Sequence, residues 1–222
     1  MSSSRFPNES DEYRASRDAL LTAEADLRAA VERVAALRRQ LPMGGALKED
    51  YAFTGLDQSG AATPVRFSEL FAPGKDSLFL YGMMFSEAME NPCPMCSSFL
   101  DALDGNARHI GVRINLAVVA KSPIERIAAY AEKRGWRYLR LLSSAGTTYQ
   151  RDYLAESESG GQMPMANVFV KRDGGVHHFW GSELLYAPSE GHPRHIDMMW
   201  PLWNVLDVTP DGRGSANPAL WV

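Results

Sequence analysis

Apolar and charged residues alternate with a helical period over the first part of the chain, from about Asp11 to Leu41. Leucine and valine recur there at three- and four-residue steps, with arginine and glutamate between them, which predicts one long amphipathic helix. Asn8 and Ser10 are available as caps at its start, and Pro42 with the glycines after it ends it. The apolar stripe fits a helix packed on its own domain and equally a dimerising arm, so both interpretations stay open.

From Tyr51 onward the pattern changes to short apolar runs rich in β-branched and aromatic residues, which predict strands. The predicted strands cover residues 51–54, 65–67, 78–85, 112–119, 139–142, 166–171 and 176–180. Helices are predicted between several of them, ending near Asn106, near Arg134 and near Leu154. The middle helix has the clearest start, because Ser122 supplies an N-cap and the next residue is a proline at the first helical position.

The order of these elements predicts an α/β domain with parallel strands and an antiparallel edge. The last two strands form a hairpin around the Asp-Gly-Gly turn at 173–175. Residues 193–208 predict a final helix bent at Pro201, and the remainder, rich in proline, glycine and asparagine, predicts a loose tail. The predicted organisation is a helical arm at 1–45, a domain at 46–208 and a tail at 209–222.

Composition narrows the possible partners and compartment. The chain has 222 residues, of which 45% are hydrophobic and 23% charged, as expected of a globular protein with one good core and an extension. A net charge of −4 argues against nucleic acid or an anionic membrane surface as a partner. The first ten residues lack the apolar core of a secretory signal, and no apolar run approaches membrane-spanning length. We therefore expect a cytoplasmic protein.

The only two cysteines, Cys93 and Cys96, lie between a predicted strand and a predicted helix. A cysteine at a helix N-terminus faces unpaired backbone N–H groups and the positive end of the helix dipole, and both favour the reactive thiolate. A pair at this spacing is a redox dithiol, half of a zinc site or two buried apolar thiols. A zinc site would need distant histidines, and Cys93, Cys96, His192 and His195 form one conceivable four-ligand set. In the cytoplasm a structural disulfide is disfavoured.

Other catalytic motifs have no support in the sequence. No glycine-rich phosphate loop and no serine-elbow pattern occurs, which removes the basis for nucleotide chemistry and serine hydrolysis. The neighbouring His177 and His178 lie on a predicted strand, where adjacent side chains point to opposite faces. The cysteine pair is therefore the leading candidate for chemistry.

The order of elements resembles the thioredoxin superfamily, and in detail its peroxiredoxin and membrane-tethered thioredoxin-like branch, over about Tyr51 to Val208. Domains of that branch add a hairpin before the core and a helix–strand insertion after the cysteine helix. Residues 51–71 look like the hairpin, and residues 112–140 look like the insertion and the strand after it. The resemblance implies a thioredoxin-like α/β fold of peroxiredoxin-type topology, preceded here by the long N-terminal helix.

Pro164 stands within a Gln-Met-Pro-Met-Ala run directly before a predicted strand. In the thioredoxin fold this place holds a cis-proline that lies beside the cysteine pair and offers backbone edges to a bound disulfide. The resemblance thus implies a cis Pro164 with a catalytic role, while an ordinary trans proline at a strand start is the alternative. Pro94, Met95 and Met163 would then border the substrate groove.

The two cysteines would have different roles. Cys93 comes first and lies nearer the helix tip, so it would be the attacking thiolate, and Cys96 would resolve the mixed disulfide. Glu87 and Glu90 lie just upstream and would oppose ionisation of Cys93 if they are close to it, which favours a less oxidising couple than those with basic neighbours. Peroxiredoxins carry a Pro-x-x-x-Thr-x-x-Cys signature, and here Glu90 stands where that threonine should precede Cys93, so a peroxidatic role is not predicted.

Three further stretches resemble a bacterial thioredoxin-like family catalogued as domain of unknown function 899, and they span nearly the whole chain. They are residues 6–10, residues 50–51 and residues 194–203. Members of that family are predicted dithiol-disulfide oxidoreductases, so this resemblance implies a chemistry class and names no substrate.

We therefore predict a thiol-disulfide oxidoreductase that uses Cys93 and Cys96 on protein or small-molecule disulfides, with an unknown thiol as electron donor. No cofactor, metal, nucleic acid or membrane is expected, and a homodimer through the N-terminal helix is an expected assembly. The alternative is a non-catalytic protein of the same fold that binds metal or senses redox state.

Overall fold

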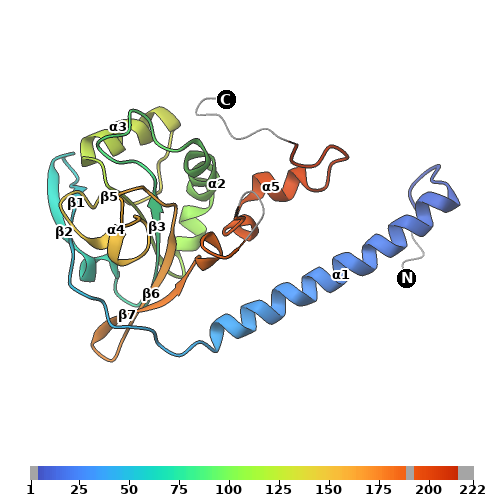
Figure 1. Ribbon diagram of the computed structural model, residues 1–222, viewed down its shortest axis with the longest axis horizontal. Helices are drawn as coiled ribbons and strands as arrows, with labels where there is room; N and C mark the ends of the chain where they lie inside the picture. The colour runs from blue at the N-terminus through green and yellow to red at the C-terminus, as the bar shows by residue number, and fades with distance from the viewer. Residues whose placement is uncertain (1–4, 189–192, 215–222) are drawn as a thin grey trace. The chain divides into compact units, whose positions relative to one another are not determined.

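The computed structural model describes residues 5–188 and 193–214 (Figure 1). The chain divides into two compact units, Met1–Pro42 and Met43–Val222, which are described here one at a time.

The first unit contains one helix, α1 (Asp11–Arg39), as the apolar periodicity predicts. Ser10 caps it, because its hydroxyl oxygen accepts a hydrogen bond from the Tyr13 amide at 3.1 Å. The first turn is acidic and the last turn carries Arg38 and Arg39, which suits the helix dipole. The expected homodimer through this helix stays a prediction.

The second unit is built on a seven-stranded sheet with the order β2-β1-β5-β4-β3-β6-β7. The strands are β1 (Ala52–Leu56), β2 (Ala62–Arg66), β3 (Ser77–Met83), β4 (Asn115–Ala120), β5 (Leu141–Ser143), β6 (Ala166–Arg172) and β7 (Gly175–Gly181). The helices are α2 (Pro94–Gly111), α3 (Ile124–Arg134), α4 (Tyr149–Asp152) and α5 (Pro201–Leu206), with short 3-10 turns η1 (Phe67–Leu70), η2 (Glu183–Leu185) and η3 (Asp197–Met199).

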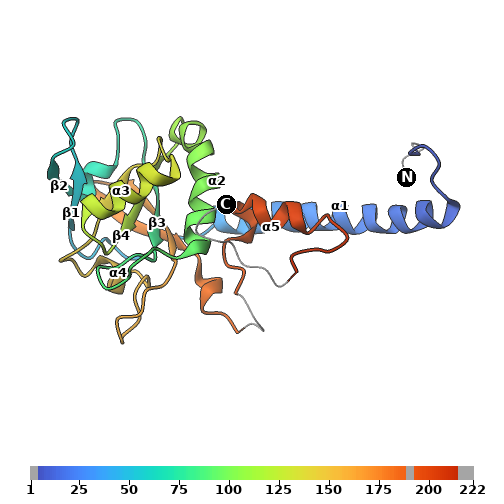
Figure 2. The same cartoon turned by 90° about the horizontal axis from the view of Figure 1, so that it is seen from above.

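Strand order and direction define the fold class. β3, β4 and β5 are parallel neighbours, whereas β6 runs antiparallel to β3 and β7 antiparallel to β6. The unit β3-α2-β4, followed by the β6–β7 hairpin and a C-terminal helix, is the thioredoxin-like arrangement. The β1–β2 hairpin and β5 extend the sheet on the β4 side, and the hairpin stands at the left end of the sheet in Figure 2. The predicted fold, with its added hairpin, is confirmed.

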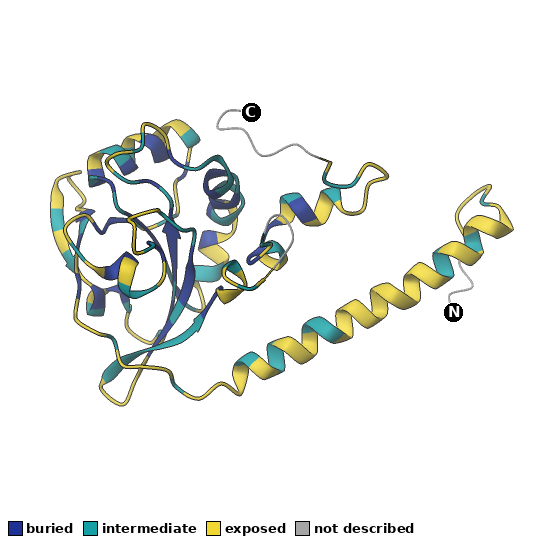
Figure 3. Cartoon of the chain, in the orientation of Figure 1, coloured by how far each residue is buried: buried dark blue, intermediate teal, exposed yellow. Residues whose placement is uncertain are grey.

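Two apolar cores cover the two faces of the sheet. Successive β3 side chains alternate between them: Leu78 and Leu80 pack with the aromatic residues of the β1–β2 hairpin and α4, whereas Tyr81 and Met83 pack with α2 and α3. The buried residues accordingly run along the central strands and the inner sides of the helices, shown dark blue in Figure 3. Coverage on both faces is what parallel strands need.

The C-terminal segment differs from the predicted bent helix over 193–208. Only α5 is α-helical there, and it begins at Pro201, since a proline without an N–H group fits the first helical position. η3 precedes it as a separate turn. The segment still packs on the core, because Trp200 contacts Phe99 of α2 with ring centroids 5.9 Å apart.

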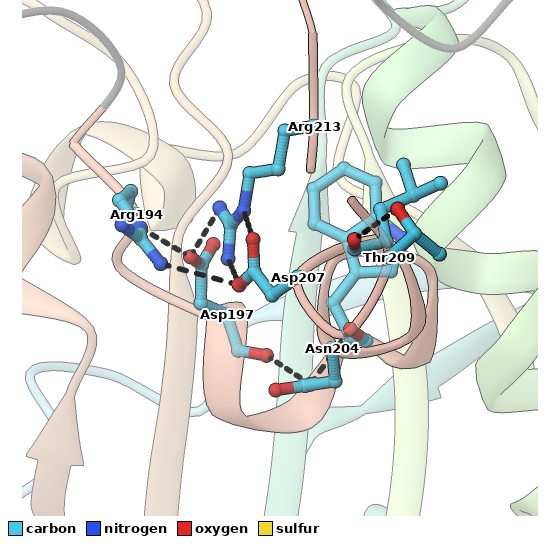
Figure 4. A network of polar contacts seen from close by, with 8 residues as sticks. Arg194, Asp197, Asn204, Asp207, Thr209 and Arg213 are labelled. Carbon is cyan, nitrogen blue, oxygen red and sulfur yellow. Dashed lines mark hydrogen bonds and ion pairs between the residues drawn. The ribbon is translucent and has the colours of Figure 1, made fainter. Parts of the chain in front are cut away.

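The first residues of the expected tail, 209–214, are described, and Arg213 among them contacts earlier residues. The Arg213 guanidinium donates hydrogen bonds to Asp207 at 2.6 and 2.5 Å and to Asp197 at 2.6 Å, and Arg194 donates to Asp197 as well (Figure 4). The same guanidinium lies 5.2 Å from the centre of the Trp203 ring. This polar network fastens the chain after α5 back onto η3, and the rest of the predicted tail, 215–222, lies outside the described residues.

Among the described residues, none of the helices is both long and apolar enough to cross a membrane. The cytoplasmic location stays a prediction.

We expect Trp200→Ala to lower the free energy of unfolding by about 3–5 kcal/mol, because the indole is 2% exposed and fills the space between α2 and α5. Urea unfolding followed by circular dichroism measures this change. Val205→Ala in α5 is the control, since Val205 is 62% exposed and should change stability by no more than about 0.5 kcal/mol. Equal effects of the two substitutions would contradict the packing described here.

Candidate active site

The cysteine pair lies at the end of the connection from β3 to α2, at a strand–helix junction as the sequence predicts. β3 ends at Met83, and α2 begins at Pro94, so Cys93 is the N-cap residue of the helix. The Cys93 amide donates a hydrogen bond to the Met84 carbonyl at 3.0 Å, which holds the helix tip against the residue that follows β3. Pro94 occupies the first helical position, where its missing N–H is no loss.

Cys93 is the more acidic of the two thiols. Hydrogen bonds from the Cys96 thiol and from the Cys96 and Met95 amides stabilise its thiolate and lower its pKa to about 6, although partial burial acts against them. Its side chain is only partly buried. Cys93 therefore combines ionisation near neutral pH with access to solvent.

Cys96 is the more buried and the less acidic of the two thiols. It is 1% exposed, and this burial raises the pKa of its thiol well above the ordinary value. Two groups act in the other direction by donating to its sulfur: the Tyr81 hydroxyl at 3.4 Å and the Met84 amide. The pair thus consists of an accessible thiolate and a buried thiol that donates to it.

Sequence reasoning missed the residue that holds the loop before the cysteines. Arg126 of α3 donates to the backbone carbonyls of Glu87 at 3.1 Å, Met89 at 2.8 Å and Glu90 at 3.3 Å, and its guanidinium lies 4.7 Å from the centre of the Phe85 ring. No local sequence motif predicts this role, because Arg126 looks like any other charged residue of an amphipathic helix. The arginine fixes the path of the chain from β3 to α2.

The predicted opposition from Glu87 and Glu90 stays a prediction. The hydrogen bonds that lower the pKa of Cys93 come from Cys96 and Met95. The two glutamates instead contribute their backbone carbonyls to the contacts with Arg126.

The first turn of α2 is also tied to α3. The Ser97 hydroxyl donates to the Cys93 carbonyl at 3.0 Å, and the Tyr130 hydroxyl of α3 donates to the Ser97 oxygen at 2.7 Å. These two bonds connect the backbone of Cys93 to α3.

The structure brings Pro164 to the edge of the sheet at which the cysteine loop begins. Tyr81 of β3 pairs with Ala166 of β6, and the Gly82 amide donates to the Met165 carbonyl at 2.7 Å. Pro164 therefore lies across from the end of β3, where the cysteine loop starts. Met163 and Pro164, like Pro94 and Met95, are partly exposed.

The expectation of a cis-proline is wrong, since the described residues contain no cis peptide bond. The Met165 amide donates to the Met163 carbonyl at 3.1 Å, which closes a three-residue turn around Pro164. An inverse γ-turn needs a central φ of about −75°, close to the value that a proline ring imposes, so a trans proline satisfies this bend. The Met163 amide donates to the Ala155 carbonyl at 2.9 Å, so the backbone edge expected to receive a substrate is already paired.

The histidines considered for a metal site are engaged elsewhere. His195 is buried with its Nδ1 3.0 Å from the Ser182 hydroxyl, and His178 Nε2 lies 2.9 Å from the Asn167 amide oxygen. Over residues 5–188 and 193–214, no three His, Cys, Asp or Glu side chains are grouped to hold a metal ion. His192 lies outside the described residues.

The strand order and the dithiol at the tip of α2 define a thioredoxin-like protein. Residues 3–222 match the model of the family described as "Bacterial protein of unknown function (DUF899)", and the chain belongs to that family. The curated proteins contain no match.

Similar solved structures are peroxiredoxins and thioredoxins. Thioredoxin peroxidase I of Plasmodium yoelii is 16% identical, with 82% of this chain and 99% of that chain covered and a TM-score of 0.47. Peroxidoxin BcpB from Mycobacterium tuberculosis is 22% identical, with 75% and 99% covered and a TM-score of 0.46. An exposed lipoprotein thioredoxin from Streptococcus pneumoniae is 14% identical, with 68% and 98% covered and a TM-score of 0.42.

We expect alkylation of Cys93 by iodoacetamide to rise with pH around a midpoint of about 6, because the thiolate is the reacting form and predominates above that pKa. Mass spectrometry of the modified protein, followed over time at each pH, gives the rate and the site. Cys96 should stay unmodified, since it is buried and protonated.

Cys96→Ala is the matched variant, because it removes the thiol that donates to Cys93 and should move the midpoint upward. A wild-type midpoint of about 8.5, the value of an ordinary thiol, would contradict the contacts at Cys93.

Proposed function

We propose that the protein is a thiol-disulfide oxidoreductase in which Cys93 is the nucleophile and Cys96 the resolving thiol. The observation that carries the proposal is the asymmetry of the pair: an accessible sulfur with a lowered pKa beside a buried sulfur with a raised one. Two cysteines that only packed in a core would have no reason to differ in this way.

The reaction follows from these properties. The Cys93 thiolate attacks one sulfur of a substrate disulfide, forms a mixed disulfide and releases the other substrate sulfur as a thiolate. Cys96 gives its proton to that thiolate and attacks the Cys93 sulfur. The bond between Cys93 and the substrate breaks, the second substrate sulfur leaves as a thiolate that takes up a proton from water, and a Cys93–Cys96 disulfide remains. Two thiols of a donor are oxidised to a disulfide as they reduce the Cys93–Cys96 disulfide, which completes the cycle.

The surface around Cys93 supports disulfides as the substrate class, in proteins or in small molecules. Pro94 and Met95 next to it in the chain, and Met163 and Pro164 across from the end of β3, offer partly exposed apolar groups, and thioether side chains adapt to differently shaped partners. Because the Met163 amide is already paired, side-chain contact rather than strand-like backbone pairing would hold the substrate.

We expect Cys93→Ser to abolish the reduction of insulin disulfides in the presence of a dithiol donor, because no nucleophile remains. Precipitation of the insulin B chain, followed by turbidity, measures the reaction. Cys96→Ala should instead trap a mixed disulfide between Cys93 and the substrate, visible by mass spectrometry. A wild-type protein that reduces no disulfide with any thiol donor would refute the proposal.

We also expect the Cys93–Cys96 pair to undergo a reversible two-electron transition between about −120 and −300 mV in defined thiol buffers. Trapping the free thiols with an alkylating agent at each potential and counting them by mass measures the transition. Failure of the pair to form a disulfide would exclude exchange catalysis, and stoichiometric metal bound through the same cysteines would favour the non-catalytic alternative.

A further inference from the structure

A buried tyrosine hydroxyl points at the resolving sulfur. Tyr81 of β3 is 1% exposed, and its hydroxyl donates to the Cys96 sulfur at 3.4 Å. The ring packs on Phe99 of α2 with centroids 4.9 Å apart. Burial and this ring contact therefore hold the hydroxyl beside the Cys96 sulfur.

The resolving step needs such a donor. Cys96 must become a thiolate before it attacks Cys93, and an unpaired anion in a site that is 1% exposed is strongly disfavoured. During the step the Cys93 sulfur is part of the mixed disulfide and is no longer an anion that accepts a hydrogen bond. The donors left at the Cys96 sulfur are the Met84 amide and the Tyr81 hydroxyl.

Tyr81 is suited to donate and not to accept the proton. Burial raises the pKa of its phenol well above the ordinary value, so the hydroxyl keeps its hydrogen throughout the reaction. The proton that leaves Cys96 must therefore go elsewhere, and the departing substrate thiolate is the base that the reaction itself supplies.

We propose that Tyr81 is a catalytic residue whose hydroxyl stabilises the Cys96 thiolate while it resolves the mixed disulfide. The inference rests on the proposed function. In the step, the proton of Cys96 passes to the substrate thiolate released first. The Cys96 thiolate then forms a bond to the Cys93 sulfur, the bond from Cys93 to the substrate breaks with its electron pair on the second substrate sulfur, and Tyr81 donates its hydrogen bond from start to finish.

The reagent 5,5′-dithiobis(2-nitrobenzoate) separates the two steps. Attack by Cys93 releases one equivalent of coloured thiolate, and resolution by Cys96 releases a second. Because this aromatic thiolate is a weak base, the proton of Cys96 passes here to the buffer. Stopped-flow absorbance on the full chain should show both phases in the wild type. Tyr81→Phe keeps the ring and removes the hydroxyl, so we expect the second phase to slow about tenfold, the size of one hydrogen bond to a charged group, with little change in the first. The pH midpoint of the second phase should rise in the variant.

Tyr149→Phe is the matched control. Tyr149 is also 1% exposed, but it belongs to the core on the other face of the sheet, away from α2, so both phases should keep their wild-type rates. An unchanged second phase in a folded Tyr81→Phe protein would overturn the inference. Absence of the second phase in the wild type would overturn the proposed function instead.

A second measurement does not depend on the folding of a variant. In the reduced wild-type protein the buried Tyr81 hydroxyl proton should be visible by NMR, and it should shift when the pair is oxidised, because a disulfide sulfur is a weaker acceptor. An identical chemical shift of the Tyr81 hydroxyl proton in the reduced and oxidised protein would also overturn the inference.

Discussion

The backbone of Met84 fixes the position of both cysteines. Its carbonyl accepts from the Cys93 amide at 3.0 Å, while its amide donates to the Cys96 sulfur. Because Met84 directly follows β3, these bonds tie the tip of α2 to the centre of the sheet. The place of the pair is therefore set by strand geometry, whereas the burial of Cys96 and its hydrogen bond to Cys93 make the two thiols differ.

Burial of Cys96 depends on parts of the chain far from it in sequence. Phe99 contacts both Tyr81 and Trp200, so the C-terminal segment belongs to the core that buries Cys96. Arg213 in turn fastens the chain after α5 to Asp197 and Asp207.

The sequence predicts those parts of the fold that local pattern determines. The helix from Asp11, the alternation of strands with helices and the position of the cysteines at a strand–helix junction all follow from periodicity, capping residues and spacing. The candidate nucleophile follows as well, since its place at the helix tip is a local property.

The remainder depends on contacts between distant residues and leaves no local signal. Arg126 and Arg213 donate hydrogen bonds to groups that only folding brings near them. Tyr81 lies in an apolar run, where the sequence pattern predicts a core side chain and gives no sign of a role for its hydroxyl. The prediction of a cis bond before Pro164 failed for a related reason. A turn closed by the Met165 amide makes the bend with a trans bond, and the sequence alone does not distinguish a cis from a trans proline.

Arg126 has a consequence for how this surface can diverge. Its three hydrogen bonds all end on backbone carbonyls, so they do not depend on which side chains stand at positions 87, 89 and 90. Relatives could change the charge and size of the loop that borders the thiolate while keeping the loop's path. The path of the loop is thereby independent of the chemical character of the surface that the loop presents beside Cys93.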